Sequence, residues 1–329
     1  MNANAALPSI VFLDAATLGD ATLALTVLAE CYPCKVHAVT APEDTAARIA
    51  GHSIVVTNKV ALRAELLASQ AAASLRLIAV AATGVDVIDL EAARLRGIAV
   101  ANVVGYSTRS VAEHTWSLIL ELATRTGRLD HAVREGGWSQ SPIFTMFDHP
   151  RVDLAGKTLG IVGYGAIGRA VAAIGAAFGM TVLVAARPGS AGPVPADRVP
   201  LDELLTRADV VSLHCPLTDA TRELINAATL GRMKREAWLV NTARGALIDE
   251  EALVAALRAG RLGGAALDVL TREPPPADHP IVRAMPDLPT LVVTPHVAWT
   301  SREARRRLSE GVADNVHAFL RGERRNRVV

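Results

Sequence analysis

The chain has few cysteines. Its 329 residues include only Cys31, Cys34 and Cys215. Three thiols cannot build the disulfide framework of a small secreted domain, and the Cys31–Cys34 pair lacks the second pair of ligands that a zinc site needs. We therefore expect no metal site. We interpret the Cys-x-x-Cys spacing as incidental, with a redox motif as the alternative.

An excess of charge of either sign is also missing. The chain has 34 Lys and Arg residues against 33 Asp and Glu residues, a formal net charge of +1. This balance favours neither nucleic acid nor an acidic membrane surface as a partner. The one basic concentration lies near the C-terminus, where glutamates interrupt it, so we predict a solvated helix face there. Its members are Arg302, Arg305, Arg306, Arg307, Arg321, Arg324, Arg325 and Arg327.

Long hydrophobic runs are absent as well. No segment approaches the roughly 18 uncharged apolar residues of a membrane-spanning helix. The segment MNANAALPSIVFLD has neither the positive region nor the long apolar core of a secretory signal. We therefore expect a cytoplasmic protein that does not enter a membrane.

What is present is a regular alternation of short apolar, β-branched runs with longer helical patterns. This alternation predicts α/β architecture with parallel sheets wrapped by helices, and the length allows two domains. The expected strands of the first part are 10–13, 36–38, 54–57, 77–80 and 98–101. Those of the second part are 158–162, 181–185, 210–213, 237–241, 265–269 and 291–294.

Between these two parts the pattern changes. Residues 107–126 predict one long helix with Ser107 or Thr108 as its N-cap, and 127–154 predict a less regular segment. A final helix over 301–322 places apolar residues on one stripe, so we expect it to pack against the protein. The stripe consists of Ala304, Leu308, Val312, Val316 and Leu320.

A glycine-rich motif, GYGAIG, begins at Gly163. It follows an apolar strand and opens a helix that includes Ala166 and Ile167, which is the setting of a dinucleotide-binding loop. In that setting Gly163 permits a tight turn, Gly165 lets a pyrophosphate approach the backbone, and Gly168 lets helix pack against strand. The phosphates would meet N–H groups at the N-terminus of the helix.

The end of the next predicted strand bears on the choice of cofactor. An NAD site has an acidic residue there for the adenine ribose, whereas this chain has Ala186, followed by Arg187. No carboxylate would repel a 2′-phosphate at this point, and a guanidinium can pair with one. We predict that NADP(H) is favoured. If Arg187 only stacks on the adenine, NAD(H) binds too.

Three polar residues lie downstream in apolar, strand-like surroundings: Arg244 in NTARGALID, Glu273 in LDVLTREPP and His296 in TPHVAWTS. Taken singly, Glu273 would be interpreted as an ordinary loop acid and His296 as a core histidine. A surface charge is the weaker interpretation of Arg244, because it interrupts a turn of small residues where a long cation has little packing value. After a dinucleotide loop, a guanidinium, a carboxylate and an imidazole together indicate hydride transfer at a carbon next to a carboxylate.

These motifs occur in order along nearly the whole chain. They also include ATGVDVIDLEAARLRGIAVANV, YSTRSVAEHT, LAGKTLGIVGYGAIGRAV and HCPLT. With this set the chain resembles the D-isomer-specific 2-hydroxyacid dehydrogenases, and within them the glycerate dehydrogenase/hydroxypyruvate (glyoxylate) reductase group. Ala186 departs from that group, which usually has an acidic residue there.

The resemblance implies a role for each of the three polar residues. Arg244 corresponds to the guanidinium that binds the substrate carboxylate and 2-oxygen, and His296 to the general acid/base. Glu273 corresponds to the carboxylate that stabilises the imidazolium form of His296. Further substrate contacts are implied at Thr83 and Gly84, through their backbone N–H groups, and at Trp138, where interface packing is the alternative.

The resemblance also implies cofactor contacts beyond the glycine loop. Asp268 corresponds to a contact of the nicotinamide carboxamide, and His214 to a neighbour of the adenosine or a structural residue. The implied set is Gly163, Gly165, Ala166, Ile167, Gly168, Arg187, His214, Pro216, Thr221, Thr242, Ala243, Asp268, His296 and Ala298.

The expected architecture is two Rossmann-like, doubly wound parallel-sheet domains with a cleft between them. Residues 1–103 with 297–329 would bind the substrate and 104–296 the dinucleotide. The resemblance implies a homodimer that acts on a small D-2-hydroxy acid/2-oxo acid pair such as glycerate/hydroxypyruvate or glycolate/glyoxylate. The alternatives are phosphoglycerate dehydrogenase activity and a dinucleotide-sensing corepressor. The intact catalytic trio argues against the corepressor, and the amide partner that formate dehydrogenase uses is replaced by Glu273.

Overall fold

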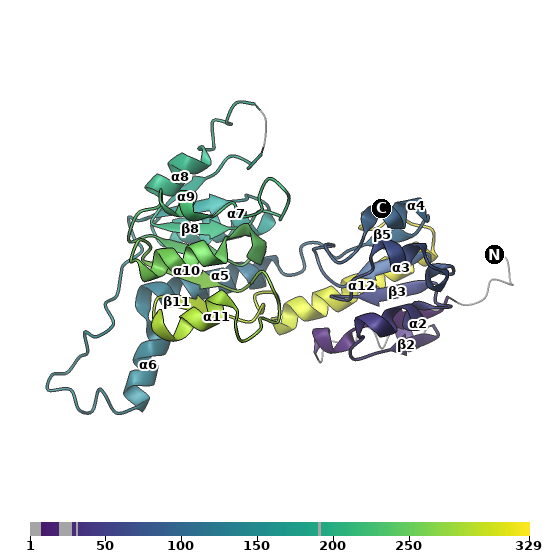
Figure 1. The fold of residues 1–329 in the computed structure, drawn as a ribbon, viewed down its shortest axis with the longest axis horizontal. Coiled ribbons are helices and arrows are strands. Elements are labelled where there is room, and N and C mark those ends of the chain that lie inside the picture. The colour runs from purple at the N-terminus through teal and green to yellow at the C-terminus, as the bar shows by residue number, and fades with distance from the viewer. Residues whose placement is uncertain (1–7, 20–27, 31, 190–191) are drawn as a thin grey trace. The chain divides into compact units, whose positions relative to one another are not determined.

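The computed structural model describes residues 8–19, 28–30, 32–189 and 192–329. The chain divides into two compact units, each built on a parallel sheet (Figure 1). Unit 1 consists of Met1–Ser107 and Thr300–Val329, and unit 2 of Thr108–Trp299. The predicted α/β class with two parallel-sheet domains is confirmed. Cys31 lies outside the described residues, so the interpretation of the Cys-x-x-Cys spacing stays a prediction.

Unit 1 contains a five-stranded sheet in the order β2-β1-β3-β4-β5. Its strands are β1 (Ile10–Phe12), β2 (Cys34–Val36), β3 (Ile54–Thr57), β4 (Leu77–Val80) and β5 (Ala99–Ala101). All of its strand pairs are parallel, so every strand ends at the same edge of the sheet. β1 and β3 are neighbours whose chain connections leave in opposite directions, which makes their carboxyl ends the switch point of this sheet.

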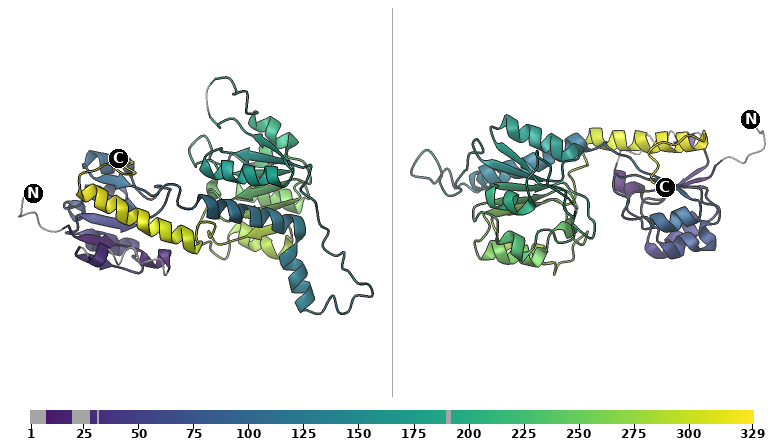
Figure 2. Two further views of the ribbon diagram at one scale, coloured as in Figure 1. Left: turned by 180° about the vertical axis from the view of Figure 1, so that it is seen from behind. Right: turned by 90° about the horizontal axis from the view of Figure 1, so that it is seen from above.

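Helices cover both faces of the unit 1 sheet. They are α2 (Thr45–Ile49), α3 (Ala64–Ala68), α4 (Leu90–Leu95) and α12 (Arg302–Leu320), with the short 3₁₀ helices η1 (Ala15–Leu18), η2 (Pro42–Asp44) and η3 (Gln70–Ala72). Figure 2 shows α12 along one face and α3 and α4 on the other. The predicted stripe on α12 is buried from Ala304 to Val316, because it packs against the sheet.

The arginines of α12 are not all on a solvated face. Arg302 and Arg306 are exposed as predicted. Arg305 donates to the carbonyl oxygens of Thr300 and Leu18, and Arg307 donates to that of Tyr106. These two side chains cap loops of unit 1, which charge patterning along the helix does not reveal.

Unit 2 contains a six-stranded sheet in the order β11-β10-β9-β8-β6-β7. Its strands are β6 (Thr158–Val162), β7 (Thr181–Val184), β8 (Val210–Leu213), β9 (Trp238–Asn241), β10 (Gly264–Leu267) and β11 (Leu291–Val293). All pairs are parallel. The chain passes from β6 out to β7 and then back across to β8, so the switch point lies between β6 and β8.

Two core layers sandwich the unit 2 sheet. α5 (Thr108–Thr124) and α7 (Ala166–Ala177) pack on one face, where Trp116 and Ile119 meet Ile161. On the other face lie α8 (Leu201–Arg207), α9 (Ala227–Leu230), α10 (Glu250–Arg258) and α11 (Pro280–Ala284), together with η4 (Gly245–Leu247) and η5 (Met285–Asp287) (Figure 2). Alternate residues of each strand point to opposite layers, so these strands are buried on both faces.

Three local predictions need correction. The helix expected over 107–126 ends at Thr124, because Arg125 adopts a left-handed conformation with φ 55°. The segment expected to be irregular then begins with a further helix, α6 (Thr126–Arg134). The strand expected at 36–38 is β2, which starts at Cys34. β2 is an edge strand, and Val36 is half exposed. Burial therefore hardly constrains where along the sequence this strand begins and ends.

Among the described residues, no helix is both long and apolar enough to cross a membrane. Within the same ranges, no group of three or more His, Cys, Asp or Glu side chains is arranged to hold a metal ion.

Candidate active site

Arg244, Glu273 and His296 all lie beyond the carboxyl ends of neighbouring strands. Arg244 follows β9, Glu273 follows β10 and His296 follows β11, and these three strands are adjacent in the sheet. Because the strands are parallel, the three residues emerge at the same edge of unit 2. This edge is where open α/β sheets bind their ligands.

Glu273 and His296 are in direct contact. Nδ1 of His296 lies 2.6 Å from Oε2 of Glu273, and the other carboxylate oxygen, Oε1, accepts the backbone N–H of Leu270 at 2.9 Å. Both side chains keep partial solvent access, at 25% and 33% exposure for His296 and Glu273. The contact assigns Nδ1 to the carboxylate, so Nε2 is the ring nitrogen available for proton transfer to a ligand.

The backbone of His296 has a left-handed conformation, with φ 55°. This conformation is uncommon for a residue with a side chain, and here Asp268 maintains it. The His296 N–H donates to the Asp268 carbonyl at 2.8 Å. The N–H groups of Val297 and Ala298 donate to the Asp268 carboxylate, each at 2.9 Å. The loop that carries the imidazole is thus fixed on both sides of His296.

The Asp268 carboxylate is 1% exposed and accepts two further side chains. Thr294 Oγ1 donates to it at 2.6 Å, and Nε2 of His114 lies 3.3 Å away. Burial alone would raise the pKa of Asp268, but the hydrogen bonds from His114, Thr294 and the backbone outweigh it and hold that pKa below its usual value. Asp268 therefore organises the His296 loop, a task that the sequence did not indicate.

Arg244 is half-buried on a turn that Asn241 stabilises. The Asn241 side chain donates to the Arg244 carbonyl at 2.8 Å and accepts the Ala243 N–H at 3.0 Å. The next residue, Gly245, packs directly on the Glu273 loop: a Cβ there would lie 2.0 Å from the carbonyl carbon of Leu270. Only glycine allows this approach, so the Arg244 turn and the Glu273 loop have backbone-to-backbone contact.

The glycine motif has the shape that a dinucleotide requires. A Cβ on Gly163 would lie 2.4 Å from the Cys215 N atom, across the switch point, and a Cβ on Gly168 would lie 2.1 Å from the Gly163 carbonyl oxygen. A Cβ on Gly165 would meet no atom within 4 Å, so this position faces open space at the N-terminus of α7. The residues present therefore fit a pyrophosphate over Gly165, Ala166 and Ile167.

The other residues implied for the cofactor follow β8, β9 and β11. Desolvation by burial lowers the pKa of His214 to about 4, and its Nε2 lies 2.9 Å from Ser212 Oγ. Thr221 is buried and donates to the Pro216 carbonyl at 2.7 Å. Thr242 is buried beside Thr115, while Ala243 is half-buried and Ala298 is buried.

Arg187 is exposed just beyond β7, and the structure also brings Arg198 next to the end of this strand. The Val199 N–H donates to the Val184 carbonyl and the Ala186 N–H to the Val199 carbonyl, so Arg198 lies next to the strand end. Its guanidinium lies 4.6 Å from the ring centroid of Tyr164, in the glycine motif, and 3.2 Å from Asp197. Arg198 lies in the irregular stretch between β7 and α8, so no local pattern predicts its position next to the end of β7.

Thr83 and Gly84 belong to unit 1, where they follow β4. The Thr83 hydroxyl donates to the Val103 carbonyl at 2.9 Å, and the Thr83 carbonyl accepts from the Asn102 side chain at 2.6 Å. Trp138 lies in unit 2 after α6, is 53% exposed, and donates to the Phe144 carbonyl at 3.1 Å.

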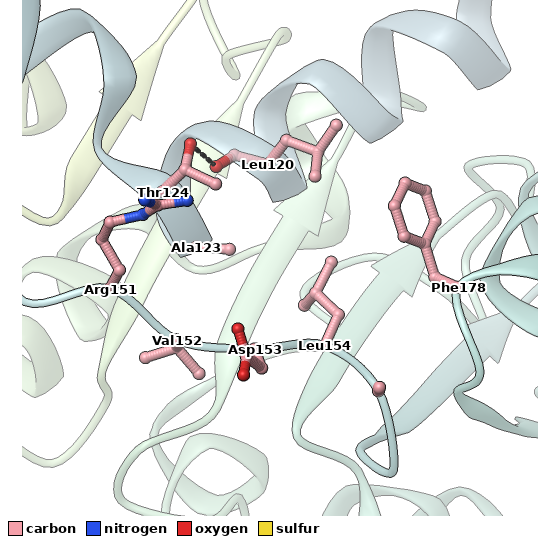
Figure 3. A pocket seen from close by; sticks show the side chains of 9 residues that line it. Leu120, Ala123, Thr124, Arg151, Val152, Asp153, Leu154 and Phe178 are labelled. Atoms are coloured by element: carbon pink, nitrogen blue, oxygen red, sulfur yellow. Dashed lines mark hydrogen bonds between the residues drawn. The ribbon is translucent and has the colours of Figure 1, made fainter.

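A cavity of about 490 Å³ lies elsewhere in unit 2 (Figure 3). Leu120 and Thr124 of α5, Phe178 after α7 and the segment 151–155 line it. The segment leads into β6 and Phe178 precedes β7, so the cavity lies near the amino ends of these strands. None of the proposed site residues lines it.

Comparison with known proteins identifies the family. Residues 116–298 match the family model described as "D-isomer specific 2-hydroxyacid dehydrogenase, NAD binding domain". The chain is 43% identical over 318 residues to the glycerate dehydrogenase of Methylorubrum extorquens, an alignment that covers 96% of this chain and 98% of that protein.

Solved structures agree. A protein from Thermus thermophilus is 39% identical and superimposes with a TM-score of 0.83, covering 98% of this chain and 100% of that chain. An acyclic imino acid reductase in complex with NADPH and D-Arg is 27% identical with a TM-score of 0.85, again over 98% and 100%. With the strand-end edge, the glycine loop and these matches, the chain belongs to the D-isomer-specific 2-hydroxyacid dehydrogenase family and is an NAD(P)-dependent oxidoreductase.

Proposed function

We propose that the chain catalyses hydride transfer between NADP(H) and a small 2-oxo acid/D-2-hydroxy acid pair, such as hydroxypyruvate/glycerate or glyoxylate/glycolate. The contact between Glu273 and His296, on the sheet edge that also carries Arg244, is the observation that supports this most. The name of the Methylorubrum relative, glycerate dehydrogenase, favours glycerate within the substrate class.

In this proposal each residue acts on one carboxylate–carbonyl unit. Arg244 binds the carboxylate and the 2-oxygen, for which a planar guanidinium provides two parallel donors. His296, protonated on Nε2, gives that proton to the carbonyl oxygen as the C–H bond forms at C2. Glu273 stabilises the imidazolium before transfer and keeps Nε2 pointed at the substrate through Nδ1. When bound, the reduced nicotinamide supplies the hydride.

We assign the dinucleotide to unit 2, where the glycine motif lies, and the substrate contacts Thr83 and Gly84 to unit 1. Their backbone N–H groups would bind the substrate carboxylate. The remaining cofactor contacts are those implied by the family resemblance, including Asp268. Trp138 is proposed as a contact of the substrate or of a second subunit in a homodimer, and the compartment is proposed to be the cytoplasm.

The residues at the end of β7 support the proposed preference for NADP(H). Ala186 offers no carboxylate to bind a ribose 2′-hydroxyl or to repel a 2′-phosphate, and Arg187 and Arg198 both lie there. Asp197, 3.2 Å from the Arg198 guanidinium, is a competing anion for that side chain.

The test is turnover by the purified protein. NADPH and hydroxypyruvate, glyoxylate or a larger 2-oxo acid are mixed with it, and the absorbance of the reduced nicotinamide is followed. We expect oxidation of NADPH, with hydroxypyruvate and glyoxylate among the best substrates. Absence of turnover on every 2-oxo acid, with either cofactor, would contradict the proposal.

A further inference from the structure

Glu250 is a buried carboxylate that the proposed reaction does not use. It is 7% exposed and opens α10, a few residues after Arg244. Its Oε1 accepts the backbone N–H of Thr271 at 2.9 Å, and its Oε2 accepts the Thr271 hydroxyl. Oε2 also lies 3.2 Å from Nε2 of His279, which is 5% exposed. A buried carboxylate is costly unless such contacts compensate it, so this arrangement depends on each partner.

The two partners of Glu250 are the ends of one loop. Thr271 and His279 begin and end the stretch 271–279, which contains Glu273. Nδ1 of His279 is buried and has no hydrogen-bond partner among the described residues. Nε2 lies close to Glu250 Oε2 and, at 3.4 Å, to the Thr271 hydroxyl, while Nδ1 is left unsatisfied. The polar contacts that hold the His279 side chain are therefore those with Glu250 and with the residue that Glu250 itself binds. One carboxylate thus closes the loop that carries Glu273.

This closure acts directly on the Glu273 carboxylate. Oε1 of Glu273 accepts the N–H of Leu270, the residue next to Thr271. A shift of the Thr271 backbone therefore moves the donor that orients Glu273. Gly245 contacts the backbone of Thr271 as well, since a Cβ on Gly245 would lie 2.3 Å from the Thr271 N atom. Thr271 is therefore the residue at which Glu250 holds the loop and at which the Arg244 turn packs against it.

We propose that Glu250 is a positioning residue for the catalytic pair. By binding Thr271 and His279 it fixes the loop 271–279, so that Glu273 meets His296 at a set spacing from Arg244. The inference rests on the proposed function, because it takes Glu273 and His296 as the reacting pair. Glu250 itself touches neither of them in the proposed mechanism.

The test compares Glu250→Ala with Glu251→Ala. Glu251 is the next residue of α10 and is exposed, so its removal deletes the same charge at the same helix end without touching the loop. We expect Glu250→Ala to lower kcat by about 10- to 100-fold, as small displacements of catalytic groups do. Its pH profile should shift in the same direction as that of Glu273→Gln, with little change in NADPH affinity. Glu251→Ala should match the wild type.

A double mutant separates positioning from general destabilisation. In a Glu273→Gln background, Glu250→Ala should change kcat by no more than about twofold, because its effect passes through Glu273. An equal loss in both backgrounds, or an unmoved pH profile in Glu250→Ala, would overturn the inference.

Folding is monitored by thermal unfolding. If Glu250→Ala does not fold, Glu250→Gln and Thr271→Val replace it, since each removes part of the contact and keeps the Thr271 N–H donor. Both should then show the shifted pH profile, and a normal profile in both would overturn the inference. If the wild type turns over and the pH profile shifts in Glu273→Gln but not in the Glu250 and Thr271 variants, only the role of Glu250 is contradicted. No turnover by the wild type contradicts the proposed function, and this inference falls with it.

Discussion

His296 and Glu273 form a pair in which the carboxylate is itself oriented: Oε2 lies 2.6 Å from Nδ1 of His296, while Oε1 accepts the Leu270 N–H. The imidazole is fixed from its own side by Asp268, which binds the backbone at His296, Val297 and Ala298. Two loops from adjacent strands thus determine the position of the proposed proton donor.

Glu273→Gln should shift the pH dependence of 2-oxo acid reduction. An amide cannot stabilise the imidazolium as a carboxylate does, so we expect the alkaline limit of kcat/KM to move to lower pH. The measurement is kcat/KM against pH for Glu273→Gln, with Glu251→Gln as the control. An unmoved profile would rule out the role assigned to Glu273.

His296→Ala should remove the general acid. We expect kcat to fall by about 10²- to 10⁴-fold, the usual contribution of a positioned acid or base, and NADPH affinity to fall much less, because the other implied cofactor contacts remain. Steady-state kinetics and fluorescence titration with NADPH measure the two quantities. His131→Ala, which changes an exposed histidine on α6, is the control and should match the wild type. A kcat within tenfold of the wild type would contradict the assignment.

Arg244→Lys should weaken substrate binding although it keeps the charge. An ammonium cannot donate two parallel hydrogen bonds, and loss of one bond to a charged group costs about 1.5–3 kcal/mol, or about 10- to 100-fold in kcat/KM. Arg258→Lys on the exposed end of α10 is the matched control. Equal kcat/KM values for Arg244→Lys and the wild type would show that Arg244 does not bind the substrate.

Ala186→Asp should turn the cofactor preference toward NADH. A carboxylate at the end of β7 would repel a 2′-phosphate and accept hydrogen bonds from a ribose, so we expect kcat/KM with NADPH to fall by about 10- to 100-fold. Arg187→Ala should lower the value for NADPH and leave that for NADH nearly unchanged. A wild type with higher kcat/KM for NADH than for NADPH would refute the proposed preference.

His214 should make the fold sensitive to mild acid. Desolvation lowers its pKa to about 4 in the folded protein, from an ordinary value of 6.5. Between these values the unfolded chain binds more protons than the folded one, so the free energy of unfolding falls as the pH drops from about 6.5 to 4. Urea unfolding midpoints over this range should decline less steeply for His214→Gln than for the wild type. Parallel slopes would mean that His214 is not the group responsible.

Sequence patterns predicted elements well where burial is strong. β3, β4, β6 and β8 have the predicted limits, because their strands are buried and their apolar runs are unbroken. The patterns failed at the edge strand β2 and at Arg125, whose left-handed backbone separates α5 from α6. At both places local composition allows more than one structure, and long-range packing makes the choice.

The sequence by itself determined the family, the glycine loop and the identities of Arg244, Glu273 and His296, because local motifs of ordered residues carry that information. Tertiary structure alone decided how these residues are held. Asp268 fixes the His296 loop, Glu250 closes the Glu273 loop, and Arg198 lies beside the end of β7. These contacts join positions distant in sequence, through buried hydrogen bonds that form only when strands, loops and helices of unit 2 pack together.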